Sequence, residues 1–93
     1  MAERLLILGG TSDAARLAER AVEMFGDRLQ VISSLAGRLG ATPVLPGEVR
    51  IGGFGGVAGL VDALRELHID LVVDATHPFA SVISAHAAAA CAT

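Results

Sequence analysis

A short polar segment that starts at Asp74 carries the side chains best suited to chemistry in this sequence. Asp74, Thr76 and His77 place a carboxylate, a hydroxyl and an imidazole within four residues. They follow the mostly apolar stretch Ile69–Val73, typical of a buried strand, and Pro78 after them is common in the first turn of a helix. Open α/β sheets bind ligands at the carboxyl ends of their strands, so this segment predicts one wall of a ligand site. In the alternative interpretation, Thr76 or His77 caps the helix and Asp74 binds nearby N–H groups.

A second loop of the same kind lies near the amino terminus. The apolar run Leu5–Leu8 leads into Gly9–Ser12, and a helical pattern follows. Glycines let a backbone turn tightly and approach a ligand, and the free N–H groups at a helix start attract phosphate. The spacing is not that of a G-x-G-x-x-G motif. A plain turn capped by Thr11 or Ser12 is the alternative, which Asp13 in the first helical turn favours.

The end of the predicted second strand, Leu29–Ser33, indicates which nucleotide would fit. A cofactor with a free ribose 2′-hydroxyl usually meets an Asp or Glu at this place. This chain has Ser33, Ser34 and then Arg38, with no acid between positions 30 and 44. Hydroxyls and a guanidinium suit a 2′-phosphate, so the pattern favours NADP(H) over NAD(H). Alternatively, Arg38 is a solvated loop residue.

A glycine-rich segment, Gly52–Gly56, follows the short predicted strand Val49–Ile51 and surrounds Phe54 with four glycines. So many glycines are entropically costly unless the backbone bends sharply or lies against a flat ligand. A surface loop with Phe54 packed into the core is the alternative. Both interpretations remain open from the sequence.

The elements that must position these loops are recognisable from apolar spacing. Helical periodicity predicts helices over 13–25, 56–67 and 79–91, and apolar runs predict strands over Leu5–Leu8, Leu29–Ser33, Val49–Ile51 and Ile69–Val73. Strands that alternate with helices imply right-handed crossovers and a parallel sheet. We therefore expect a three-layer αβα Rossmann-like domain over residues 1–93, with strand order 3-2-1-4.

Composition restricts the function further. The chain has 93 residues, a net charge of −3 and 53% hydrophobic residues, which suffices for one small core. It contains no Lys, which argues against nucleic-acid binding, and Cys91 is its single cysteine, which fits a reducing compartment. No membrane span, targeting segment, metal-binding cluster or hydrolase motif is recognisable, so we expect a cytoplasmic protein without a metal. The last helix lacks a stop signal, and we expect the chain to be the amino-terminal part of a longer protein.

Four segments, taken in order, resemble the precorrin-6A reductase family of cobalamin biosynthesis, and the resemblance covers nearly the whole chain. They are Leu8–Ala14, Ser34–Arg38, Arg50–Gly56 and Asp74–Ala80. The resemblance implies an oxidoreductase that uses NADPH to reduce a tetrapyrrole, precorrin-6A or its cobalt-containing counterpart, to the dihydro product. It also implies a second α/β domain, absent here, in proteins about twice as long, with the macrocycle in the cleft between the domains. We therefore expect this chain alone to be inactive.

The same resemblance assigns cofactor-binding roles to individual residues and identifies no catalytic residue or proton donor. The pyrophosphate is assigned to Gly9, Gly10, Thr11 and Ser12, the 2′-phosphate to Ser33, Ser34 and Arg38, and the nicotinamide side to Gly53, Phe54, Gly55, Thr76, His77 and Pro78. The cofactor supplies the hydride, so the protein contributes placement and electrostatics.

Two other functions compete with this one. The chain could be a non-catalytic nucleotide-binding Rossmann module of a regulatory or transport protein. It could also belong to an extended Rossmann reductase or epimerase, but that class normally carries a Tyr-x-x-x-Lys pair and this chain contains neither residue.

Overall fold

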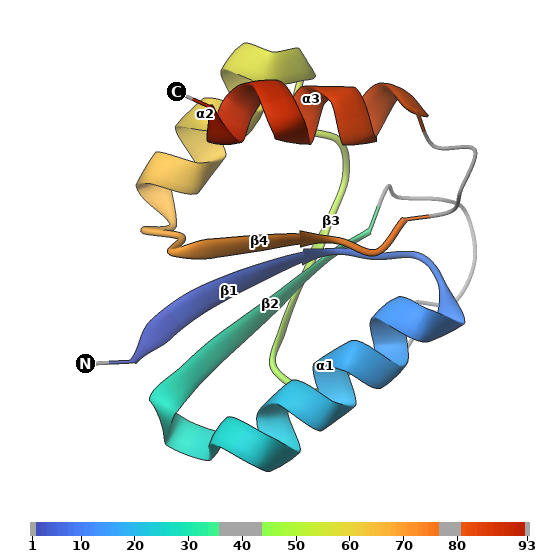
Figure 1. The fold of residues 1–93 in the computed structure, drawn as a ribbon, viewed down its shortest axis with the longest axis vertical. Coiled ribbons are helices and arrows are strands. Elements are labelled where there is room, and N and C mark those ends of the chain that lie inside the picture. The colour runs from blue at the N-terminus through green and yellow to red at the C-terminus, as the bar shows by residue number, and fades with distance from the viewer. Residues whose placement is uncertain (1, 36–43, 77–80, 93) are drawn as a thin grey trace.

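The computed structural model describes residues 2–35, 44–76 and 81–92. Strands and helices alternate along the described parts of the chain, except that β3 is the next described element after β2 (Figure 1). The elements are β1 (Glu3–Leu8), α1 (Ser12–Phe25), the 3₁₀ helix η1 (Gly26–Arg28), β2 (Leu29–Leu35), β3 (Glu48–Ile51), α2 (Gly56–Glu66), β4 (Leu71–Asp74) and α3 (Ser81–Cys91). None of these helices is long and apolar enough to cross a membrane, as far as the described residues extend.

The four strands form one parallel sheet in the order β3-β2-β1-β4, which confirms the predicted topology. Leu8, the last residue of β1, pairs with Ser34 of β2 and with Asp74 of β4. Ser34 in turn pairs with Arg50 of β3. The carboxyl ends of all four strands therefore meet at one edge of the sheet, which we call the carboxyl edge.

Strand β1 is buried on both faces, and this makes the domain three-layered. Leu5 and Ile7 pack with Val31 against α1, where the buried residues are Ala14, Ala18 and Ala21. On the other face, Leu6 and Leu8 pack with Ile32 against α2 and α3, which contribute Leu60, Ala87 and Ala90. Figure 1 shows α1 on one side of the sheet and α2 with α3 on the other. The continuous apolar run Leu5–Leu8 is what allows β1 to be buried on both faces.

The structure corrects several details of the predicted elements. Strand β2 continues to Leu35, so that Ser33 and Ser34 lie inside the strand. Strand β4 begins at Leu71 rather than at Ile69, whose N–H donates to the carbonyl of Leu64 in α2 (3.0 Å). Phe25, which ends the apolar stripe of α1, is 45% exposed rather than part of the core.

Gly59 in α2 allows the helix to pass close to the preceding loop. A Cβ atom at this position would lie 1.7 Å from the carbonyl oxygen of Phe54 and 2.7 Å from its carbonyl carbon. No other side chain could occupy this place without movement of the loop or the helix. The close approach fixes where Phe54 lies relative to α2, and Phe54 packs with Val57 and Leu60 in the core on that face.

Candidate nucleotide-binding site

The loop between β1 and α1 is held by Thr11. Gly10 has φ of 100°, a conformation that favours glycine, and Thr11 after it is the N-cap of α1. The Thr11 hydroxyl accepts a hydrogen bond from the N–H of Ala14 (3.1 Å) and donates one to the carbonyl of Ala75 (2.7 Å). Capping by Thr11, which the sequence left open, is thus present. Within the described part of the chain the N–H groups of Ser12 and Asp13 have no partner.

The loop after β4 lies against this first loop. The N–H of Ala75 donates to the carbonyl of Leu8 (3.0 Å), in addition to the bond between Thr11 and the Ala75 carbonyl. Asp74 accepts hydrogen bonds from the N–H and the hydroxyl of Thr76. Hydrogen bonds from the hydroxyls of Ser84 and Thr76 hold the pKa of the Asp74 carboxyl below its ordinary value. Asp74 therefore organises the loop by binding nearby donors. This agrees with the alternative interpretation of the sequence, in which Asp74 binds nearby N–H groups.

The end of β2 forms the other neighbour of the first loop. The N–H of Gly9 donates to the carbonyl of Ser34 (2.8 Å). Ser33 and Ser34 are both buried, at 2% and 6% exposure. The hydroxyl of Ser33 is buried, and it has no hydrogen-bond partner among the residues that the structure describes. A buried hydroxyl without a partner costs stability unless a ligand or an ordered water binds it.

The glycine-rich loop after β3 is organised by Arg50, which the sequence analysis did not single out. The N–H of Gly52 donates to the carbonyl of Leu35, the last residue of β2 (2.9 Å). The guanidinium of Arg50 binds the carbonyls of Gly52 (3.0 Å) and Gly53 (3.2 Å) and lies 4.0 Å from the centre of the Phe54 ring. The one sequence signal for this was an arginine two residues before a glycine run that contains a single aromatic residue.

These contacts link the four predicted segments in a row, each to its neighbour along the carboxyl edge. The first loop contacts both the end of β2 and the loop after β4. The loop 52–56 contacts β2, but β3 and β4 are the outer strands, so two strands lie between this loop and Thr76. The predicted grouping of Phe54 with Thr76 on the nicotinamide side stays a prediction. Arg38, His77 and Pro78 lie outside the described residues.

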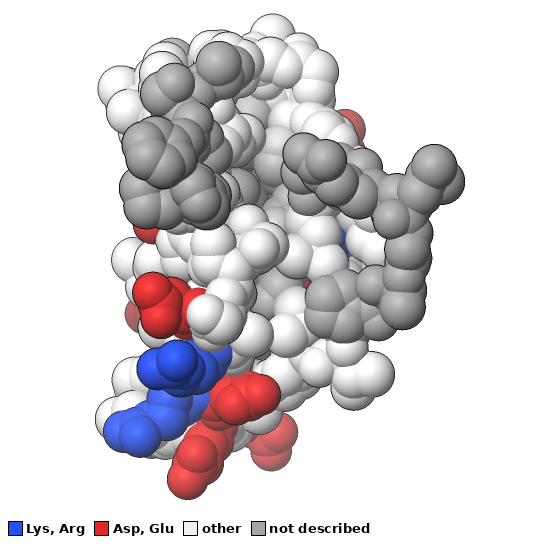
Figure 2. Space-filling view, turned by 90° about the vertical axis from the view of Figure 1, so that its right-hand side faces the viewer, with Lys and Arg blue, Asp and Glu red and all other residues white. Residues whose placement is uncertain are grey.

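Few charges face the candidate site. Figure 2 views the molecule from the side where the carboxyl ends of β1 and β4 lie. Charged side chains in this view gather at the lower end, over α1, and most of the other described surface is uncharged. Among residues 2–35, 44–76 and 81–92, no group of three or more His, Cys, Asp and Glu side chains could hold a metal ion.

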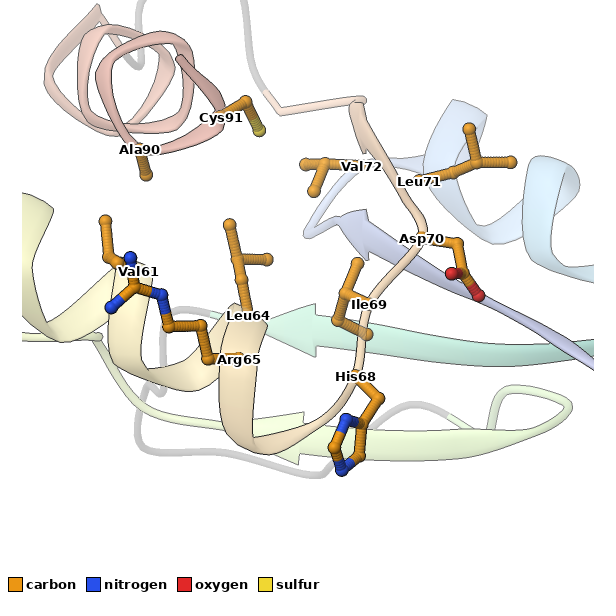
Figure 3. Close-up of a pocket in the computed structure, with 10 residues that line it drawn as sticks. All are labelled: Val61, Leu64, Arg65, His68, Ile69, Asp70, Leu71, Val72, Ala90 and Cys91. Atoms are coloured by element: carbon orange, nitrogen blue, oxygen red, sulfur yellow. The ribbon is translucent and has the colours of Figure 1, made fainter. Parts of the chain in front are cut away.

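A cavity of about 640 Å³ lies at the opposite end of the sheet. It is bounded by the last turns of α2 and α3 and by the start of β4 (Figure 3). Val61, Leu64 and Ala90 line its apolar part, and Arg65 and His68 lie at its side. None of the predicted cofactor residues lines this cavity. The glycine turns and the helix start lie at the carboxyl edge, which is therefore the candidate site.

A parallel sheet covered on both faces, with glycine turns and a helix start at its carboxyl edge, defines a Rossmann-like α/β domain of the class that binds nucleotides at this edge. The family model for "Precorrin-6x reductase CbiJ/CobK" matches residues 4–93. The chain therefore belongs to the precorrin-6A reductase family, as its motifs indicated.

Individual relatives agree with this assignment. The chain is 53% identical to precorrin-6A reductase of Rhodobacter capsulatus and 55% identical to that of Mycobacterium tuberculosis, over 89 residues in each case. These matches cover 96% and 95% of this chain, and 34% of each relative. A solved structure of CobK precorrin-6A reductase superposes with a TM-score of 0.90 at 52% identity, over 97% of this chain and 35% of that one. The chain thus spans about a third of the length of these relatives, rather than the half that we expected.

Proposed function

We propose that this chain is the NADPH-binding part of a precorrin-6A reductase, which reduces precorrin-6A or its cobalt-containing counterpart to the dihydro product. The relatives of similar sequence carry that name, and the fold positions glycine turns and a helix start where a dinucleotide binds. The whole enzyme would require the remaining two thirds of the length seen in those relatives, including the second wall of a macrocycle site.

The buried hydroxyl of Ser33 is the observation that carries the choice of NADPH. It lies near the carboxyl end of β2, where an acid would select a free ribose hydroxyl, and no described residue is its hydrogen-bond partner. β2 itself contains no acid. A 2′-phosphate offers acceptor oxygens to such a hydroxyl, and Ser34 and Arg38 follow in sequence. We propose that Ser33, Ser34 and Arg38 bind this group.

The rest of the cofactor would also bind at the carboxyl edge of the sheet. The N–H groups of Ser12 and Asp13 are available at the start of α1, and we propose that they and the Gly9–Gly10 turn bind the pyrophosphate. Asp13 is acidic, so the pyrophosphate would approach its backbone rather than its side chain. Thr76, His77 and Pro78 follow β4 and would face the nicotinamide half. When bound, NADPH supplies the hydride, and the protein orients it and excludes water.

Binding and turnover measurements test this function separately. Calorimetric titration of the full-length gene product with NADPH and NADH should give tighter binding of NADPH. The reduction of precorrin-6A, followed through the absorbance of the macrocycle, should require that full-length product. We expect residues 1–93 alone to show weak NADPH binding and no turnover, because one open wall cannot hold the macrocycle in a reactive geometry.

The alternatives predict other outcomes. A non-catalytic nucleotide-binding module would bind NADPH but would not reduce precorrin-6A even as the full-length product. Equal affinities for NADPH and NADH would contradict the role proposed for the end of β2.

A further inference from the structure

Arg50 lies at the carboxyl edge, beside the residues proposed to bind the 2′-phosphate. It belongs to β3, and its register partner on β2 is Ser34. Its guanidinium reaches the carbonyls of Gly52 and Gly53, the first two residues after β3. These two bonds fix the charged group at the end of the strand rather than along its length. Ser34 and the guanidinium of Arg50 are therefore on neighbouring strands at the same edge of the sheet.

No described carboxylate balances the charge of Arg50. The side chain is half-buried, and both of its hydrogen-bond partners are neutral carbonyls. Within the described residues it forms no ion pair with any carboxylate. Partial burial of a cation without an anion is costly, because desolvation is not repaid by a charge partner. An anionic ligand at this edge would supply the missing partner.

The guanidinium is also held in one orientation before any ligand arrives. Its central carbon lies 4.0 Å from the centre of the Phe54 ring, an arrangement typical of a cation–π contact. Phe54 is in turn fixed by the close approach of α2 at Gly59. A guanidinium has five N–H donors, and the two loop carbonyls use two of them. The remaining donors are available to a phosphate at little entropic cost.

We propose that Arg50 is a specificity-determining residue that binds the 2′-phosphate of NADPH. This inference rests on the proposed function, and it adds to Ser33, Ser34 and Arg38 a cation whose position is defined by the fold. It also assigns the Arg50–Phe54 pair to the adenosine half of the cofactor, next to β2, in place of the nicotinamide side that the family resemblance assigned to Phe54. If Arg50 acts only as a clamp for the loop 52–56, its removal weakens NADPH and NADH binding equally.

Arg50→Met in the full-length gene product tests this, with four ligands titrated by calorimetry: NADPH, NADH, 2′,5′-ADP and 5′-AMP. Loss of a charge-assisted phosphate contact should weaken NADPH and 2′,5′-ADP about ten- to a hundredfold. The affinities for NADH and 5′-AMP should change less than about twofold, since neither ligand has a 2′-phosphate. Arg65→Met, which removes an exposed arginine at the far end of α2, is the matched control and should change none of the four.

The possible results separate the two proposals. Equal losses for the phosphorylated and unphosphorylated ligands, or no loss at all, would overturn the role of Arg50 and leave the proposed function standing. A wild-type protein without preference for NADPH would overturn both. If thermal unfolding shows that Arg50→Met does not fold, Arg50→Lys decides: it keeps the charge but not the planar fork, and should still weaken 2′,5′-ADP relative to 5′-AMP.

Discussion

The hydroxyl of Thr11 donates a hydrogen bond to the carbonyl of Ala75, across 64 positions of sequence, while it also caps α1. One side chain thus fixes the loop after β1 against the loop after β4. These are the two loops that flank the point where the sheet order reverses, which is where nucleotides bind in open α/β sheets. Thr11 therefore acts through its hydroxyl as a structural tie. Its carbonyl accepts a hydrogen bond from the N–H of Ala15 (3.1 Å), and its own N–H has no partner among the described residues.

Thr11→Val should lower the free energy of unfolding by about 1–3 kcal/mol, because it removes the N-cap and the bond to Ala75 and keeps the shape of the side chain. Urea denaturation followed by circular dichroism measures this change. Thr11→Ser retains the hydroxyl and is the control. A loss in Thr11→Ser with none in Thr11→Val would show that the methyl group, and not the two hydrogen bonds, is what matters.

Ser33→Ala should have opposite effects on stability and on binding. Removal of a buried hydroxyl that lacks a partner should raise the free energy of unfolding by about 1 kcal/mol. The same change should weaken NADPH binding, because the hydroxyl is proposed to meet the 2′-phosphate. Ser12→Ala at an exposed position should change stability by less than about 0.5 kcal/mol. A Ser33→Ala variant that is both less stable and unchanged in affinity would contradict this prediction.

Arg38→Ala should weaken NADPH binding about ten- to a hundredfold, which corresponds to the loss of a charge-assisted contact. NADH binding should barely change. Fluorescence titration with both cofactors measures the two affinities in one preparation. A parallel loss for both would mean that Arg38 supports the fold and does not contact the phosphate.

Asp74 should make the domain less stable in acid. Its carboxyl has a pKa below the ordinary value of 3.8 in the folded state, because the hydroxyls of Ser84 and Thr76 bind its ionised form. The resulting stabilisation is fully present above the unfolded pKa and is lost as the pH falls from about 5 through the lower, folded pKa. Asp74→Asn should therefore reduce the dependence of unfolding free energy on pH between 5 and 3, measured by urea denaturation.

The matched control for this pH series is Asp62→Asn, at an exposed acid of α2 outside the Asp74 hydrogen bonds. It should leave the slope close to that of the wild type. If the unfolding free energy of Asp74→Asn depends on pH as strongly as that of the wild type, carboxyls other than Asp74 cause the loss of stability in acid.

Gly59→Ala should destabilise the domain, although the same change usually stabilises a helix by about 1 kcal/mol. The new methyl group would overlap the carbonyl oxygen of Phe54, and overpacking of this kind typically costs about 1–3 kcal/mol. Thermal unfolding gives the sign of the effect. Ala58→Gly, at the neighbouring exposed position, should cost about 1 kcal/mol through helix propensity alone. A more stable Gly59→Ala variant would mean that α2 and the loop separate easily.

The fold could be predicted because its signals are local and repeated. The run Leu5–Leu8 could be buried only between two layers, and helical spacing in α1 and α2 supplied those layers. The boundaries were less accurate where polar residues occur in buried strands. Ser33 and Ser34 resembled the end of a strand, yet strand pairing with Ile7 and Leu8 continues through both of them. The polar side chains of Ser33 and Ser34 predict an exposed strand end. The backbone hydrogen bonds between β1 and β2 nevertheless keep both residues inside the sheet.

The sequence predicted which loops form the candidate site, but it did not predict the side-chain contacts between them. Thr11 could be recognised as a cap from its position before a helix, but no spacing reveals that its hydroxyl also reaches Ala75. Arg50 could not be selected from the sequence either, because its role depends on a guanidinium that folds back over Phe54 and the following carbonyls. Contacts between segments distant in sequence depend on the packed structure.

The central position of β1 has a consequence for how the chain is made. Leu5 pairs with Val31, which is 26 residues later (31 − 5), and with Leu71, which is 66 residues later (71 − 5). At a synthesis rate of roughly 5–20 residues per second, the second partner emerges about 3–13 s after the first strand. Leu6 and Leu8 lack the cover of α2 until residues 56–66 have been made and that of α3 until residues 81–91 have been made, so this apolar surface stays exposed for most of synthesis. The strand that is most deeply buried in the folded domain is thus made first and covered last.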